Sequence, residues 1–457
     1  MSKSPLQENK MGVMPVGKLL VNMAAPMVLS MLVQALYNVI DSIYVSQISE
    51  SAVTALALAF PVQNLQIGFA VGIGVGVNSL LSKSLGQHDQ EGANRAAGNG
   101  MFLMFIAMAI FMIFGIVGVR PYYEMQSDVM ETVESGIIYS RICCLLTLGI
   151  FMEILAERLL QATGRTVHTM ITQGVGAIIN IILDPILIHG WLGIPAMGVA
   201  GAAVATVIGQ WVAALLALYF NEYHNPEVQF GVRYFKPQWA TIRQILTVGV
   251  PSIIMNGISS FTNFSINQIL LGFKALGETA AGVFGIYFKL QSFFFMPVFG
   301  LNTATISIIA YNYGARKPER IMKTLKIGCM TALSLMLAGT LVFQLIPEVL
   351  LGMFNPSDTF MELGCRTLRV ISLHFPVAAF CIMMIASFQA LGNGIYSTVT
   401  SLFRQVIGLL PAAYLLSLTG NVNNVWWAYP IAELISASAC ALLFLRLYRQ
   451  KIKPLYD

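Results

Sequence analysis

Four acidic residues lie inside long apolar stretches in the N-terminal half of this 457-residue chain: Asp41, Glu153, Glu157 and Asp184. An ionised group in hydrocarbon costs roughly 2.5–3.5 kcal/mol on insertion scales, so such residues usually have a partner or a task. Asn180 precedes Asp184 by one helical turn, and Pro185 frees a backbone carbonyl at the same depth. These oxygens suit Na⁺, and two neighbouring carboxylates can instead hold a proton. We therefore expect Asp41, Asn180 and Asp184 to bind a coupling ion, either H⁺ or Na⁺.

The segment that ends at Asp41 carries a stripe of polar residues. Gln34, Tyr37, Asn38 and Asp41 recur at intervals of three or four residues, which places them on one face of a helix. We expect this face to line the path of the substrate. Two alternatives stay open, because Asp41 could be a helix-end residue at the outer interface and Asp184 could cap a broken helix.

Glu153 and Glu157 lie one turn apart on a single helical face, and Arg158 follows them. The two acids could form structural ion pairs with the arginine. Alternatively, they could attract cations or carry protons along the substrate path. The sequence leaves both interpretations open.

Aromatic residues are concentrated farther along the chain, in the seventh and eighth apolar runs. Phe288, with Met255 nearby, belongs to a surface that could hold flat lipophilic cations by stacking and cation–π contact. The same aromatics could instead pack against lipid or neighbouring helices. We include Met255 and Phe288 in the expected substrate path.

The composition indicates what surrounds these residues. Hydrophobic residues make up 56% of the chain and charged residues 10%, whereas a soluble domain carries about 25% charged residues. A membrane-spanning chain accommodates this excess because lipid also accepts apolar side chains on the outside of the protein. A soluble enzyme, a nucleic-acid binder and a single-span receptor are therefore excluded, and basic cytoplasmic loops explain the net charge of +5.

Twelve apolar runs of spanning length follow one another along the chain. They lie near residues 19–45, 53–80, 96–118, 136–160, 167–189, 197–221, 243–271, 280–311, 321–346, 366–391, 395–418 and 425–447. Lys and Arg gather in the tails and in alternate loops. By the positive-inside rule, this distribution predicts that both termini are cytoplasmic.

The two halves of the chain resemble each other at an offset of 228 residues. Gln161–Gly164 matches Gln389–Gly392, Gly72 matches Gly300, and Pro26 matches Pro251 with a three-residue gap. Six spans in each copy give both copies the same orientation, so an axis near the membrane normal should relate them, with a cleft between. The predicted fold is an all-α membrane protein of twelve transmembrane helices in two pseudo-symmetric six-helix lobes, residues 1–228 and 229–457.

No motif for catalysis or nucleotide binding occurs in the sequence. The glycine-rich segment Gly68–Gly76 lies within a span and lacks the strand, Lys and Ser/Thr of a phosphate-binding loop. Small residues at four-residue spacing are typical of close helix packing. We therefore expect no enzymatic activity and no cofactor, with an ion gradient as the source of energy.

The sequence resembles the multidrug and toxic compound extrusion (MATE) family over nearly its whole length, and is most similar to its DinF- and MepA-like bacterial members. The resemblance is carried by Pro26, by Gln34, Tyr37 and Asp41, and by the segments 79–86, 161–164 and 180–185. It implies that an ion gradient drives the export of cationic or amphipathic compounds through two six-helix lobes.

The resemblance also implies roles for single residues. Asp41 would be the essential first-helix aspartate of the branch that couples through the N-terminal lobe, and Asn180 and Asp184 would be its cation-site residues. Thr206 would be the hydroxyl of the sixth helix, although Ala202 sits one turn earlier. Another branch uses acids in the seventh and tenth helices, which this chain lacks, so a coupling site in the C-terminal lobe is not expected.

Our hypothesis from the sequence is a bacterial plasma-membrane antiporter that exports organic cations or amphipathic drugs in exchange for H⁺ or Na⁺. It would work as a monomer within the lipid bilayer and bind no nucleic acid. A lipid-linked-oligosaccharide flippase of the same two-lobe plan is the first alternative, but a pyrophosphate would call for cationic groups where this chain has acids. A membrane-embedded enzyme or channel is the second alternative, disfavoured by the missing catalytic motif and by the repeat.

Overall fold

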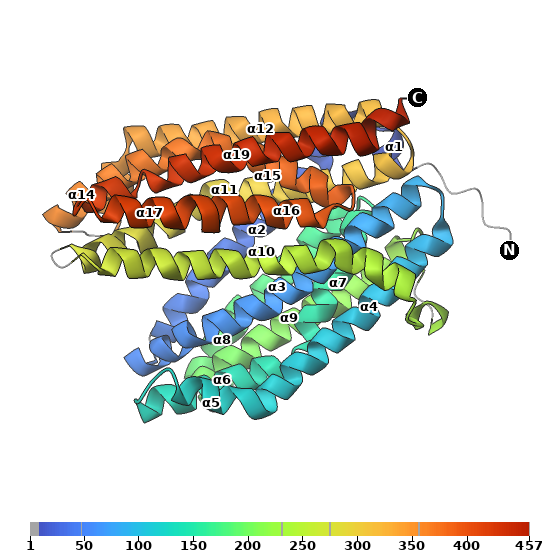
Figure 1. Cartoon of the computed structure of the whole chain (residues 1–457). Coiled ribbons are helices and arrows are strands. Elements are labelled where there is room, and N and C mark those ends of the chain that lie inside the picture. The colour runs from blue at the N-terminus through green and yellow to red at the C-terminus, as the bar shows by residue number, and fades with distance from the viewer. Residues whose placement is uncertain (1–8, 47, 230–231, 274–275, 355–356, 457) are drawn as a thin grey trace. The chain divides into compact units, whose positions relative to one another are not determined.

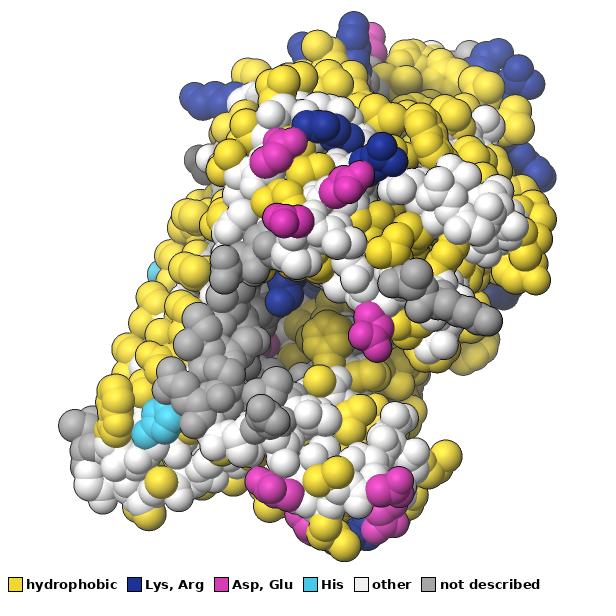
Figure 2. Space-filling model, turned by 90° about the vertical axis from the view of Figure 1, so that its left-hand side faces the viewer, with side chains coloured by type: hydrophobic (Ala, Val, Ile, Leu, Met, Phe, Trp, Pro, Cys, Tyr) yellow, Lys and Arg dark blue, Asp and Glu magenta, His cyan; other side chains and the backbone are white. Residues whose placement is uncertain are grey.

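Most of the chain that the structure describes is helical (Figure 1). The computed structural model describes residues 9–46, 48–229, 232–273, 276–354 and 357–456, and these ranges contain no strand. Eleven helical stretches within them are long and apolar enough to cross a membrane, and the pair α6 (Met130–Leu145) and α7 (Leu148–Ala162), bent by 47°, brings the number to twelve. The predicted twelve-span all-α membrane protein is confirmed. Hydrophobic side chains also cover much of the face shown in Figure 2, among scattered charged ones.

Two helices pass from one compact unit of the chain to the other. Unit 1 contains Leu29–Ile253 with Asn9, and unit 2 contains Lys10–Val28 with the chain from Ile254 onward. The border therefore falls inside α2 (Val16–Ser46) and inside α10 (Trp239–Leu271). The division into lobes of residues 1–228 and 229–457 stays a prediction, because the compact units do not follow the order of the chain.

Unit 1 is built from the second half of α2, the first half of α10 and the helices between them. In addition to α6 and α7, these are α3 (Glu50–Gly86), α4 (Gln90–Ile113), η1 (Phe114–Gly118), α5 (Val119–Glu124), α8 (Thr166–His189), η2 (Trp191–Gly193), α9 (Val199–His224) and η3 (Val232–Phe235). Local signals set several starts: Ser49 accepts a hydrogen bond from Ala52 N at 3.1 Å before α3, and Asp89 accepts one from Gly92 N at 2.8 Å before α4. Such caps satisfy amide groups that have no partner in the first turn of a helix.

Unit 2 repeats this plan with the first half of α2, the second half of α10 and the helices that follow. These are α1 (Lys10–Val13), α11 (Gly277–Gly314), α12 (Pro318–Leu345), α13 (Pro347–Gly352), α14 (Asp358–Ile371), η4 (Ser372–His374), α15 (Phe375–Ala390), α16 (Gly394–Leu402), η5 (Phe403–Leu409), α17 (Leu410–Ser417), α18 (Val422–Val425), α19 (Ala428–Leu447), η6 (Tyr448–Ile452) and η7 (Lys453–Leu455). The segments α14, η4 and α15 form one span with a break at its centre.

Equivalent turns in the two units show that the sequence repeat is a structural repeat. Gly164 has φ +81° and Gly392, 228 residues later, has φ +73°, in the left-handed region that favours glycine. Arg165 N donates to Leu160 O at 2.7 Å, and Asn393 N donates to Phe388 O at 2.8 Å. The matching Gln-Ala-x-Gly segments therefore encode the same helix ending twice.

The repeat also pairs two glycines, one in each unit, at which the backbone of another helix approaches closely. A Cβ atom on Gly72 of α3 would lie 2.9 Å from Gly249 O of α10, and one on Gly300 of α11 would lie 2.9 Å from Val28 N of α2. Both contacts fall beside the matched prolines, Pro251 and Pro26. The glycines therefore hold the first half of α10 in unit 1 and the first half of α2 in unit 2.

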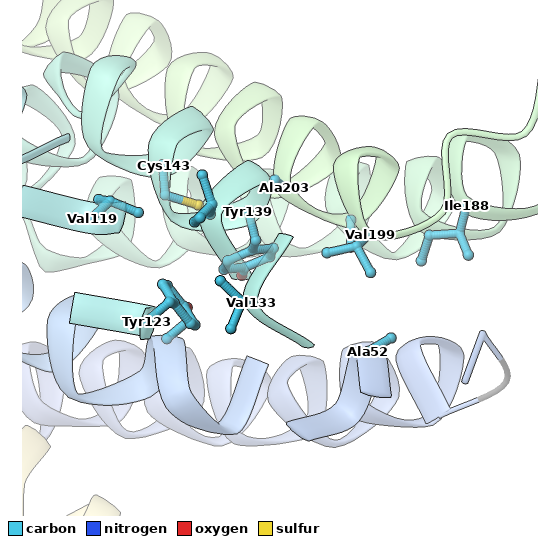
Figure 3. Packing of buried hydrophobic residues seen from close by; sticks show 12 residues of the cluster. Ala52, Val119, Tyr123, Val133, Tyr139, Cys143, Ile188, Val199 and Ala203 are labelled. Atoms are coloured by element: carbon cyan, nitrogen blue, oxygen red, sulfur yellow. The ribbon is translucent and has the colours of Figure 1, made fainter. Parts of the chain in front are cut away.

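A buried apolar cluster in unit 1 fixes the position of α6 and, through the bend, of α7. Tyr123 and Val133 belong to one cluster with Ala52 of α3 and Val199 of α9 (Figure 3). The hydroxyl of Tyr123 donates to Ala55 O at 3.2 Å and lies 2.8 Å from the hydroxyl of Ser140. The buried phenol is therefore satisfied without water.

Replacing either close-contact glycine should destabilise the protein. We expect Gly72→Ala and Gly300→Ala each to lower the thermal unfolding midpoint of the detergent-solubilised protein, at a cost of about 1–3 kcal/mol, because the new methyl group meets backbone atoms. Gly174→Ala and Gly285→Ala are the matched controls, since their Cβ atoms would have no neighbour within 4 Å. Equal losses in all four variants would contradict this account.

Candidate ion-binding site

Asn180, Asp184 and Thr206 form a buried polar group between α8 and α9 of unit 1. Their exposed fractions are 2%, 0% and 6%. With its amide nitrogen facing Asp184, Asn180 donates to Asp184 Oδ2 at 2.9 Å, and its amide oxygen accepts from Thr206 N at 3.0 Å. The hydroxyl of Thr206 lies 3.3 Å from the same end of the amide. Carboxylate, amide and hydroxyl oxygens, the donor set that suits a hard cation or a proton, thus lie together in an apolar layer.

Two glycines bring α8 and α9 close enough for this contact. A Cβ atom on Gly209 would lie 2.8 Å from Gly176 O and 3.3 Å from Asn180 Cβ. The two helices pack along each other (Figure 1), with these glycines at their contact. The sequence suggested Thr206 only by resemblance, and the packing of α9 on α8 places it against Asn180.

Pro185 lies inside α8, which continues to His189. Asp184 is therefore in the body of a helix, and the structure does not support the alternative that it caps a helix end. On α2, position 41 lies before the end of the helix at Ser46. The side chains of Tyr37, Asn38 and Asp41 lie outside the described residues, and Gln34 is exposed. The meeting of Asp41 with Asp184 stays a prediction.

Glu157 of α7 is 4% exposed and is satisfied by two neutral donors from α8. Thr172 Oγ1 donates to its Oε1 at 2.8 Å, and Gln173 Nε2 donates to its Oε2 at 2.7 Å. Arg158 turns to Gln161, donating from Nη1 to Oε1 at 2.8 Å. Within the described residues Arg158 and Glu157 form no hydrogen-bonded ion pair, although their charges interact, so both interpretations of this acid stay open.

Room for Arg158 is provided by the glycine-rich stretch of α3. A Cβ atom on Gly74 would lie 2.8 Å from Cγ of Arg158. Glu153, one turn before Glu157, is partly buried. Sequence reasoning missed Thr172 and Gln173, because no spacing along the chain links them to residue 157; only the packing of α7 on α8 does.

Met255 and Phe288 belong to unit 2 and are partly buried. The Phe288 ring contacts Phe284 edge-on, with centroids 4.9 Å apart, and lies 5.8 Å from the Tyr287 ring. One side of Phe288 is thus used in packing within the unit. A role of these two residues in a substrate path stays a prediction.

Comparisons with known proteins agree with the repeat and with the fold. A family model described as MatE matches the chain twice, over residues 26–186 and 251–415, and the two matches begin at the paired prolines. The chain is 24% identical over 443 residues to the multidrug export protein MepA of Staphylococcus aureus, covering 96% of this chain and 95% of that protein. It is also 24% identical over 439 residues to an FAD transporter of Shewanella oneidensis, covering 95% of each.

A solved structure of an outward-facing multidrug resistance MATE family transporter of the MOP superfamily has the same fold. The TM-score is 0.90 at 26% identity, with 99% of this chain and all of that chain covered. Both the predicted family resemblance and the predicted fold are thereby confirmed.

The hydrogen bond from Thr172 to Glu157 should be measurable as stability. We expect Thr172→Val to destabilise the solubilised protein by about 1.5–3 kcal/mol, because it removes a donor from a buried carboxyl group. Thr169→Val is the matched control: Thr169 is equally buried on the same helix, and its hydroxyl has no partner within the described residues. A thermal unfolding midpoint lowered no more by Thr172→Val than by Thr169→Val would contradict the assignment.

Proposed function

Because this chain belongs to the MatE family, we propose that it is a secondary active antiporter that exports organic cations or amphipathic drugs in exchange for H⁺ or Na⁺. In this proposal the coupling ion binds to Asp41, Asn180 and Asp184, with the hydroxyl of Thr206 beside them. The multidrug export protein and multidrug resistance transporter among its relatives support the class of substrate. The protein acts as a carrier rather than as an enzyme and uses no cofactor.

The observation that carries the proposal is the buried polar group in which Asn180 contacts both Asp184 and Thr206. Asp184 is fully buried within a membrane-spanning helix, where a carboxylate is costly unless an ion or a proton compensates its charge. Binding of H⁺ or Na⁺ would change the charge of this group and so favour one arrangement of the helices over another. An ion can shift such an equilibrium only by its difference in affinity for the two states, which is the basis of alternating access.

The acids of unit 1 favour a cationic substrate over an anionic one. Glu153 and Glu157 lie on α7 in the same unit as Asp184, and they would attract organic cations along the path with Gln34, Tyr37 and Asn38. One relative is named an FAD transporter, and FAD is an anion rather than a cation. A test of the substrate class must therefore include an anion. A lipid-linked-oligosaccharide flippase would need cationic groups to meet a pyrophosphate.

The remaining parts of the proposal concern topology, oligomeric state and the contribution of unit 2. Both termini are cytoplasmic in a bacterial plasma membrane, since the basic residues gather in the tails and alternate loops. A single chain carries both repeats, so the protein works as a monomer. In unit 2, Met255 and Phe288 contribute an apolar and aromatic surface to the substrate path.

Transport by purified protein in liposomes tests this function. Liposomes loaded with a fluorescent cationic dye, or with an anionic flavin in a parallel series, receive a pH gradient or a Na⁺ gradient separately. We expect cationic dye exchange driven by one of the two gradients, with Asp41→Asn and Asp184→Asn each lowering the initial rate at least tenfold. The loss would follow because neither variant can change its charge on binding the ion.

Asp128→Asn is the control, because Asp128 is an exposed acid outside the long apolar runs and should keep the wild-type rate. The gradient that drives exchange identifies the ion. Exchange of the anion alone would show that the substrates are anions rather than organic cations. No exchange under either gradient would overturn the antiporter proposal. Full activity of Asp184→Asn would move the coupling site away from α8.

A further inference from the structure

Unit 2 contains a buried charged cluster that the function proposed above does not use. Glu433 of α19 is 3% exposed and His374 of η4 is 7% exposed. Glu433 Oε2 lies 3.4 Å from His374 Nδ1, and Glu433 Oε1 lies 3.8 Å from Arg404 Nη1 of η5. The carboxylate is thus placed between a permanent cation and a group that becomes a cation when it binds a proton.

The surroundings of this cluster are aromatic and contain few other titratable groups. His374 Nε2 lies 3.2 Å from the hydroxyl of Tyr287 on α11, and the imidazole ring lies 5.8 Å from the Tyr429 ring on α19 and 6.0 Å from the Phe295 ring. The thiol of Cys381 on α15 also faces Glu433. On α14, Arg369 pairs with Glu348 at the surface. On α12, the neighbours of η4 are the neutral Thr340 and Gln344.

Two atoms of the cluster lack hydrogen bonds, and one of them is a ring nitrogen that can bind a proton. Neither His374 Nδ1 nor Glu433 Oε1 has a hydrogen-bond partner within the described residues, although both are buried. A charged imidazole would supply a charge-assisted bond from Nδ1 to Oε2, the carboxylate oxygen 3.4 Å away, while Oε1 faces Arg404. With a neutral ring, Arg404 and Glu433 cancel in charge, whereas a protonated ring gives the cluster a net charge of one positive unit.

His374 and Arg404 both lie on irregular helix segments. His374 ends the 3₁₀ turn that separates α14 from α15, and Arg404 lies in the π-helical segment η5. Groups of α12 satisfy the break: Thr340 Oγ1 donates to Ser372 O at 3.1 Å, and Gln344 Nε2 donates to Arg369 O at 2.6 Å. Irregular segments of this kind are often found at functional sites, because they can change shape at low cost.

The cluster occurs in one copy of the repeat only. At the offset of 228 residues, His374, Arg404 and Glu433 correspond to Leu146, Gly176 and Ala205 of unit 1. In unit 1 the break between α6 and α7 carries Thr147, whose hydroxyl accepts from Gln66 Nε2 at 3.2 Å. Two copies that share their turns and glycine contacts therefore differ in the chemistry at the same break.

From this geometry we infer that His374, Glu433 and Arg404 form a proton-binding site in unit 2, with His374 as the acceptor. A proton from water binds the open ring nitrogen, so that Nδ1–H donates to Glu433 and Nε2–H donates to the hydroxyl oxygen of Tyr287. The new bond ties η4 to α19, while Arg404 sets the strength of the attraction by competing for the same carboxylate. No other bond forms or breaks.

Histidine NMR on the full-length protein tests this site directly. Ring-labelled histidine gives few signals, because the chain has five histidines, and the signal lost in His374→Gln assigns the site. We expect the wild-type ring to bind a proton within the pH range over which the full-length protein stays folded. At a fixed pH in this range, Glu433→Gln should lower the ratio of charged to neutral ring at least tenfold. Arg404→Gln should raise it.

Opposite effects of the two variants would show that the proton on His374 responds to both charges, whereas a ring that binds no proton would respond to neither. His189→Gln, which alters a histidine of unit 1, should leave the His374 signal unchanged. A His374 ring that stays neutral over the whole range, or a charged fraction that responds to neither Glu433→Gln nor Arg404→Gln, would overturn the inference. The wild-type titration and the Arg404→Gln arm still decide it if Glu433→Gln fails to fold.

A use of this site in transport rests on the proposed antiport. In the liposome assay, His374→Gln should flatten the dependence of the exchange rate on pH, while His189→Gln keeps it. Absence of all exchange in the wild type would defeat the antiporter proposal and leave the NMR result standing. Exchange with an unchanged pH profile in His374→Gln would exclude the site from transport.

Discussion

A carboxylate in a membrane-spanning helix must find its partners within the protein, because the surrounding hydrocarbon offers none. The chain meets this requirement in three ways. Glu157 receives hydrogen bonds from two neutral side chains of α8, Asp184 receives one from Asn180, and Glu433 stands beside Arg404 and His374. These solutions differ in what happens when an ion arrives. A carboxylate held by neutral donors goes from negative to neutral when a monovalent cation binds, whereas a group that pairs a carboxylate with an arginine starts neutral and becomes positive.

The repeat shows how such differences can arise on one scaffold. Both copies keep the left-handed turn at Gly164 and Gly392, and both keep a glycine, Gly72 or Gly300, where a proline-containing helix approaches. These features determine backbone positions, which tolerate little change once a helix pair is packed. Side chains that point into a unit are freer to change, provided that their polar groups are satisfied. The polar cores of the two units accordingly have different residues on corresponding helices.

Much of the fold could be predicted from the sequence, because membrane spans appear as apolar runs and the repeat appears as matching residues at a fixed offset. The twelve spans and the family are confirmed, and the match of Pro26 with Pro251 coincides with the start of the two family matches. The passage of α2 and α10 between the units could not be predicted, since a helix that changes partners halfway leaves no mark in a hydropathy pattern. The matched prolines mark where α2 and α10 pass between the units, but their presence in the sequence does not predict this passage.

The candidate site was predictable only where its members lie on one helix. Asn180 and Asp184 are one turn apart, so their contact follows from helical geometry, and the structure shows it. Thr206, Thr172 and Gln173 join their partners through the packing of α9 and α7 on α8, which depends on which glycines meet. The same limit applies to unit 2, where Glu433 is apparent from the sequence as a buried acid but its neighbours are brought to it by a helix break and a π-helical segment. Local irregularities of the helices therefore decide which ionisable groups meet, and they are the features that a residue pattern specifies least.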